Sequence, residues 1–183
     1  PYSFRQLSYT NAMTEGYAFV LEDLIFDPEF LTAYLNVSSY TGNKIKWQAH
    51  FVNLMMLRRY LGKFIYEYEM FSKNAVAKGS NIYAKTLNGT TGFVHKKENW
   101  LTDMDGGFYS SDYLRAWIMA SQVKDYLGKK FGKRWFMNKK AGEFLRKLYA
   151  KGVIEEAEDV VRKLGYKPWD TTILIKGYKS ALN

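Results

Sequence analysis

The segment that decides the fold of this 183-residue chain covers residues 110–131 and reads SSDYLRAWIMASQVKDYLGKKF. Apolar residues occupy nearly every side of a helix drawn through it, so it predicts a central helix buried all round. Polar residues inside such a helix need partners. Arg115 and Gln122 are seven residues apart on one helical face, and Tyr113 places a hydroxyl where a plain hydrophobe would fill the space.

Helical periodicity continues along the rest of the chain, and no segment alternates with a period of two. The pattern predicts helices over 11–26, 28–35, 44–73, 75–87, 110–131, 134–149, 155–164 and 170–182, with a single turn over 98–101. Segments 40–43 and 88–92 are expected to break the chain, and 103–107 to form a flexible connector. We therefore expect an all-α fold of about seven to nine helices, forming a single helical unit over residues 1–183.

The longest predicted helix, 44–73, carries an apolar stripe that we expect to face the core. The stripe consists of Trp47, Phe51, Leu54, Leu61, Ile65 and Tyr68. Arg58 interrupts it at a core-facing position. Because an unpaired interior guanidinium is costly, Arg58 predicts a buried partner.

Composition excludes several classes of site. The chain has no cysteine, which rules out disulfides, a thiolate nucleophile and cysteine-ligated zinc. Its two histidines are too few for a self-contained histidine-rich metal site; we expect His50 at the core boundary and His95 in an exposed loop.

No apolar run is long enough for a membrane span, and no signal-peptide pattern is present, so a cytoplasmic location is expected. Because residue 1 is Pro1, we expect a piece of a longer protein.

The formal net charge is +9, and eight of the 27 basic residues lie between Lys129 and Lys147, opposed only by Glu143. Such a cluster could bind phosphates, with Trp135 and Phe136 stacking on bases. The alternative is a solvated helical surface that keeps the protein soluble. Without a recognisable nucleic-acid-binding motif, the solvated surface is the favoured interpretation, and nucleic acid is the less favoured partner.

Residues 14–24, TEGYAFVLEDL, place two carboxylates in the first predicted helix. Glu15 and Glu22 are seven residues apart, so they share a helical face and lie about 10 Å apart along the axis. Taken alone, exposed glutamates on an amphipathic helix are ordinary.

This segment resembles a helix of the oligopeptidase-like zinc peptidases, the group that includes thimet oligopeptidase and oligoendopeptidase F. In that family the helix follows the HExxH helix and supplies a glutamate as third zinc ligand, with a second glutamate seven positions on. The resemblance implies that Glu15 is the metal ligand and Glu22 the second glutamate. Residues 1–13 resemble the connection between the two helices, which would put an HExxH segment about ten to fifteen residues before Pro1.

Residues 109–122, YSSDYLRAWIMASQ, are similar to the catalytic-tyrosine helix of the same peptidases and of the more distant angiotensin-converting enzyme group. There a tyrosine donates its hydroxyl to the oxyanion of the tetrahedral intermediate, and a glutamine follows nine residues later. The resemblance implies that Tyr113 is the catalytic tyrosine and Gln122 the later glutamine. Tyr109 is a second catalytic candidate, because it is close enough in sequence to replace the accompanying tyrosine of thimet-like enzymes. Glu22, Arg58, Arg115 and Gln122 are then candidates for contacts around the metal or the substrate.

The sequence departs from the family pattern in two ways. It contains no HExxH, and around Ser110 and Gly106 it lacks the tyrosine and histidine that thimet-like enzymes carry. The implied function is therefore that of the C-terminal part of a peptidase that hydrolyses oligopeptides with one zinc ion. These 183 residues alone are expected to bind zinc poorly and to be inactive without the part that carries HExxH.

Two alternatives stay open. One is a stand-alone basic helical module that binds nucleic acid or an acidic partner. The other is a degenerate, non-catalytic homologue that kept the peptidase fold.

Overall fold

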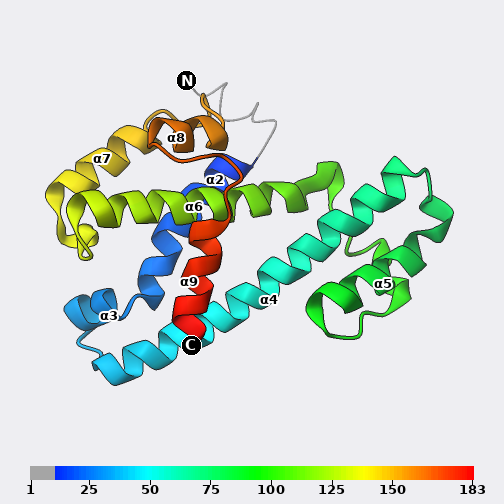
Figure 1. Cartoon of the computed structure of the whole chain (residues 1–183), viewed down its shortest axis with the longest axis horizontal. Coiled ribbons are helices and arrows are strands. Elements are labelled where there is room, and N and C mark those ends of the chain that lie inside the picture. Colours follow the sequence, from blue (N-terminus) through cyan, green and yellow to red (C-terminus); the bar gives the residue numbers. More distant parts are fainter. Residues whose placement is uncertain (1–10) are drawn as a thin grey trace. The chain divides into compact units, whose positions relative to one another are not determined.

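The computed structural model describes residues 11–183, which fold into eight α-helices without a β-strand in that range (Figure 1). The helices are α2 (Ala12–Glu22), α3 (Pro28–Leu35), α4 (Ser39–Ser72), α5 (Gly79–Thr91), α6 (Tyr109–Phe131), α7 (Lys139–Tyr149), α8 (Ala157–Lys163) and α9 (Thr172–Leu182). The all-α prediction is confirmed. Short 3-10 turns lie at 23–26, 76–78, 97–100, 106–108 and 135–137.

The chain contains two compact units. Of the described residues, the first comprises 11–51 together with 115–183, and the second comprises 52–114. Helices α4 and α6 each contribute residues to both units. The prediction of a single helical unit stays a prediction.

The core of the first unit forms around the second half of α6, with α2, α7 and α8 packed against it (Figure 1). Met119, Val123 and Leu127 of α6 are buried there. Every residue of α6 from 109 to 128 is buried or half-buried, as predicted for a covered helix, whereas Lys129 and Lys130 near its end are exposed. Gly16 permits a close approach of α2, because a Cβ at that position would lie 2.8 Å from Met119 Sδ.

The second unit has a small core between α4 and α5. It is formed by Tyr66, Met70, Tyr83, Ala84 and Leu87. A unit of this size buries only a modest fraction of its surface, so its apolar core is small.

Helix α4 begins at Ser39, five residues before the predicted start, and the predicted break at 40–43 is wrong. The Ser38 hydroxyl accepts a hydrogen bond from the Thr41 backbone N–H at 3.2 Å, which is an N-cap contact. Gly42 is needed for packing and not for a turn, because a Cβ there would lie 3.2 Å from Pro28 Cα.

The predicted core-facing stripe of α4 is also wrong. Leu61, Ile65 and Tyr68 are 42%, 39% and 59% exposed. The face that packs in the second unit consists of Gly62, Lys63, Tyr66, Glu67 and Met70. Arg58 lies outside this face and is exposed, and its Nε donates to the Thr90 carbonyl, so its predicted burial is wrong as well.

Helix α5 runs four residues beyond its predicted end, into the segment expected to be a loop. Side chains near its end bond back to the helix, since Thr91 Oγ1 donates to the Leu87 carbonyl at 2.7 Å. The helix ends at Gly92, which has a φ of 78° in the left-handed region that favours glycine.

We predict that Gly79→Ala destabilises the second unit by about 1–3 kcal/mol, as overpacking does in other cores. A Cβ at Gly79 would lie 2.4 Å from the Trp100 ring and 2.8 Å from Met70 Sδ. Native-state amide hydrogen exchange of α5 measures the change.

Gly89→Ala on the same helix is the matched control, because a Cβ there has no heavy atom within 4 Å. We expect this change to stabilise α5 by about 0.5–1 kcal/mol, since alanine is the better helix former. Equal effects of the two substitutions would contradict the packing described for Gly79.

Candidate functional site

Tyr113 lies in a cluster of three tyrosines in the second unit. Its ring is 4.5 Å from that of Tyr60 and 5.0 Å from that of Tyr109, the latter at a right angle. Burial raises the pKa of Tyr60 to about 12, and the neighbouring Tyr113 acts in the same direction. The structure therefore brings the two tyrosines predicted from the sequence together and adds a third from α4.

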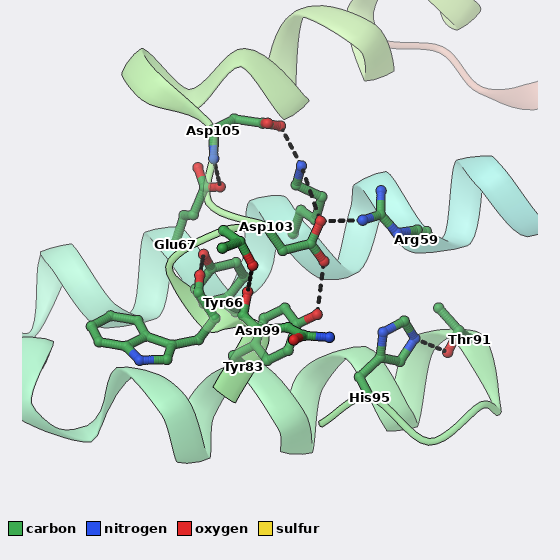
Figure 2. Close-up of polar contacts among 12 residues, drawn as sticks. Arg59, Tyr66, Glu67, Tyr83, Thr91, His95, Asn99, Asp103 and Asp105 are labelled. Carbon is green, nitrogen blue, oxygen red and sulfur yellow. Dashed lines mark hydrogen bonds and ion pairs between the residues drawn. The ribbon is translucent and has the colours of Figure 1, made fainter. Parts of the chain in front are cut away.

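The connector before α6 is held on α4 and α5 through Asp103. Figure 2 shows the Asp103 carboxylate between Arg59 of α4 and Tyr83 of α5. The carboxylate forms an ion pair with Arg59, and the Tyr83 hydroxyl donates to its Oδ2 at 2.8 Å. One aspartate thus joins three segments of the second unit.

Asp105 provides a second anchor for the same connector. Its Oδ2 lies 2.8 Å from Lys63 Nζ, which is also 3.8 Å from Asp103 Oδ1. Lys63 is only 4% exposed. A buried ammonium needs such compensation, because an uncompensated charge in the interior costs several kcal/mol.

Glu67 completes this buried polar network. It is 0% exposed, and its Oε1 accepts a hydrogen bond from the Asp105 backbone N–H at 3.0 Å (Figure 2). Burial raises the pKa of the Glu67 carboxyl, and the charge of Asp105 adds to that shift. The network thus joins α4 to both aspartates of the connector.

Both aspartates of the connector over 103–107 are ion-paired, and its predicted flexibility stays a prediction. Two glycines follow them directly. Gly106 and Gly107 are exposed, and Gly107 has a φ of 64°. The network therefore fixes the chain immediately before the helix that carries Tyr109 and Tyr113.

Glu15 and Glu22 both lie on α2, in the first unit. Glu15 is half-buried and engaged in a contact, whereas Glu22 is exposed. Tyr113 belongs to the second unit. Of residues 1–13, which were predicted to form the connection between the two family helices, residues 1–10 lie outside the described residues.

Arg115 forms an ion-paired cluster with α8. Its Nη2 lies 2.8 Å from Glu158 Oε2 and 2.9 Å from Glu156 Oε2, and its Nε donates to Glu158 Oε1 at 2.9 Å. Hydrogen bonding to Glu158 raises the pKa of Arg115, so its guanidinium stays charged. The fork-to-fork contact with Glu158 is the strong bidentate geometry of arginine–carboxylate pairs.

Gln122 shares a helical face with Arg115, as predicted, and both border a small cavity of about 10 Å³. Its Nε2 donates to the Lys167 and Asp170 carbonyls at 2.9 and 3.1 Å. In this structure Gln122 therefore holds the segment before α9 against α6.

The histidines take structural positions. His50 is half-buried, and its Nδ1 bonds to the Lys46 carbonyl at 2.9 Å, which confirms the expected core-boundary position. Burial lowers the pKa of His50. The expected exposure of His95 is wrong: it is half-buried, and its Nε2 bonds to Thr91 Oγ1 at 3.0 Å (Figure 2).

Zinc requires more ligands than this part of the chain supplies. Within residues 11–183, no group of three or more histidine, aspartate or glutamate side chains is arranged to hold a metal ion. Glu15 offers a single carboxylate. A zinc site that uses it needs the other protein ligands from outside these residues.

The base-stacking interpretation of the basic cluster is contradicted for Trp135, which is buried in the first core. Phe136 packs against Phe30 at 5.4 Å. On α7, Glu143 lines the same open depression as Arg146 and Lys147, so a carboxylate lies among the basic side chains.

Sequence reasoning missed Lys63 and Glu67. These two residues are four positions apart, so they share one helical face with Tyr66 and Met70. Their spacing could have indicated an ion-paired face that packs inward. The apolar stripe on the opposite side outweighed that signal.

Comparisons with known proteins identified no relative. No protein-family model, no curated protein and no solved structure matches this chain. No helix in the described part is both long and apolar enough to cross a membrane.

We predict that Lys63→Met destabilises the second unit by about 3–5 kcal/mol, because it leaves Asp105 without its cation in a buried site. Adding Asp105→Asn should recover part of this loss by removing the orphaned charge. Amide hydrogen exchange of α4 and α5 measures both variants.

Lys73→Met on the same helix is the control, since Lys73 pairs with Glu69 at the exposed surface. We expect an effect within about 0.5 kcal/mol. A loss as large as that of Lys63→Met, or no recovery with Asp105→Asn, would contradict the network.

Proposed function

We propose that this chain is the C-terminal part of an oligopeptidase-like zinc peptidase, in which Glu15 is the third zinc ligand and Tyr113 donates a hydrogen bond to the reacting carbonyl oxygen. The observation that carries the proposal is the presence of two family-like segments, 14–24 and 109–122, in the family's order and about a hundred residues apart. Peptides are the proposed substrates, and the cytoplasm the proposed location.

The setting of Glu15 supports a ligand role. It lies on α2, whose other residues Ala12, Met13, Gly16 and Val20 are buried. The close contact of Gly16 with Met119 holds this helix against α6. A carboxylate on a rigid helix keeps its position better than one on a loop, as a metal ligand requires.

The setting of Tyr113 supports a donor role. Its ring packs between those of Tyr60 and Tyr109, and the connector before its helix is anchored by Asp103 and Asp105. A hydroxyl held in one place can stabilise a developing oxyanion without reorganising during the reaction.

The zinc ion belongs to the complete protein in this proposal. When bound, it supplies Lewis-acid polarisation of a peptide carbonyl and an acidic bound water. This chain contributes Glu15 to the metal, and an HExxH segment outside residues 1–183 contributes the remaining protein ligands and the general base.

The first test is the reading frame of the complete protein upstream of Pro1, where the proposal requires an HExxH. In that protein, we expect one zinc per chain, with Glu15→Gln lowering zinc affinity in a chelator competition. Glu98→Gln, an exposed glutamate elsewhere, is the control. Absence of HExxH would overturn the proposal.

Tyr113→Phe should retain zinc and lower kcat by about 100- to 1,000-fold with little change in KM, as the loss of one oxyanion donor does. Tyr40→Phe, at an exposed site, should leave kcat unchanged. Full activity in Tyr113→Phe would show that this tyrosine is not the donor. A complete protein that has HExxH but neither zinc nor activity would instead be the degenerate homologue.

A further inference from the structure

Glu67 is the least compensated group in the buried polar network. Its Oε1 accepts one backbone hydrogen bond from Asp105, while its buried Oε2 has no hydrogen-bond partner among the described residues. An ionised carboxylate in such a position lacks the donors that water would supply. The neutral acid avoids most of that cost.

The charges around Glu67 are balanced without it. The charged and titratable groups near it are Arg59, Lys63 and Tyr66 of α4, Asp103 and Asp105 of the connector, and Tyr83 of α5. Two cations face two aspartates, so ionisation of Glu67 adds one uncompensated negative charge to a buried site.

The proton on Glu67 responds to pH while the neighbouring phenols keep theirs. Burial raises the pKa of the Glu67 carboxyl, the Asp105 and Asp103 charges add to the shift, and Lys63 opposes it. Burial also raises the pKa of Tyr83 to about 12 and that of Tyr66 further. Neither phenol therefore changes charge between about pH 5 and pH 9.

The connector over 103–108 is the non-α-helical segment attached to Glu67, and we infer a hinge at its two residues with positive φ. Gly107 has a φ of 64°, and Phe108 has a φ of 57°, an uncommon conformation for a residue with a side chain. The Asp105 N–H bonds to Glu67 just before these positions. Opening at this hinge requires no unwinding of α4 or α5.

We propose that Glu67 is a proton-operated latch: the protonated carboxyl keeps the 103–108 connector on α4, and ionisation releases the connector by admitting water to Oε2. The closed form binds the proton more tightly than the open form, in which Glu67 is hydrated. Rising pH therefore favours the open form over the range between the pKa of Glu67 in the open form and its higher pKa in the closed form. Above that range, the population of the open form levels off.

The latch acts on the residues directly before Tyr109, the first residue of α6. It concerns the connector itself and does not depend on the proposed peptidase function. If that function also holds, the latch makes the position of the tyrosine cluster sensitive to pH.

Hydrogen exchange of the 183-residue chain tests the latch, with rates corrected for the intrinsic effect of pH. Between pH 5 and pH 9, we expect the opening of 103–108 to increase by up to about tenfold per pH unit before it levels off. In Glu67→Gln, which keeps the acceptor for the Asp105 N–H, opening should be low and independent of pH.

Glu69→Gln is the control, because Glu69 is a neighbouring glutamate that pairs with Lys73 at the surface. This variant should retain the pH dependence of the wild type. The same pH dependence in Glu67→Gln, or opening that falls as pH rises, would overturn the proposal.

Infrared spectroscopy gives a second test that needs no folded Glu67→Gln variant. The wild type should show the carbonyl stretch of a buried protonated carboxyl group that disappears over the pH range in which the connector opens. A carboxyl band that titrates separately from the opening would overturn the latch.

Discussion

The requirement that α6 be covered on all sides organises the described structure. A helix with buried or half-buried residues from 109 to 128 needs partners for most of the polar groups it carries. In the first unit, Arg115 meets that need through Glu156 and Glu158, and Gln122 through the carbonyls of Lys167 and Asp170. These contacts determine where α8 and the segment before α9 lie, while apolar side chains supply the burial.

The second unit combines a small apolar core with a buried network of ion pairs. Its apolar core has five residues, and a buried network of ion pairs joins α4 to the connector before α6. Buried ion pairs add little net stability, because desolvation offsets their attraction, but breaking one is costly. We infer that the network selects one position for the connector, which a small apolar core alone would specify poorly.

The sequence indicated candidate catalytic residues only through their resemblance to a known family. The proposed roles of Glu15 and Tyr113 rest on a resemblance of the segments around them to a family pattern, whereas periodicity alone describes Glu15 as an ordinary helical glutamate. Tyr60 had no such signal, because its contact with Tyr113 joins residues 53 positions apart. Similarly, Glu67 meets Asp105 only when the chain folds back, so local pattern could not reveal the pair.

Local sequence patterns were enough to indicate the all-α class, the limits of α3 and the position of α6. These features follow from local causes: Asp27 caps α3 ahead of Pro28, and α6 is apolar over more than one face. The buried face of α4, by contrast, depends on contacts that form only when the chain folds. Periodicity favoured the stripe with Leu61, Ile65 and Tyr68, but Gly62 permits close packing of α5, and Arg59 and Lys63 find aspartates on the connector. Hydrophobicity measures the cost of exposing a side chain and contains no information about partners that arrive from distant parts of the chain. Such partners make the polar face of α4 the inner one.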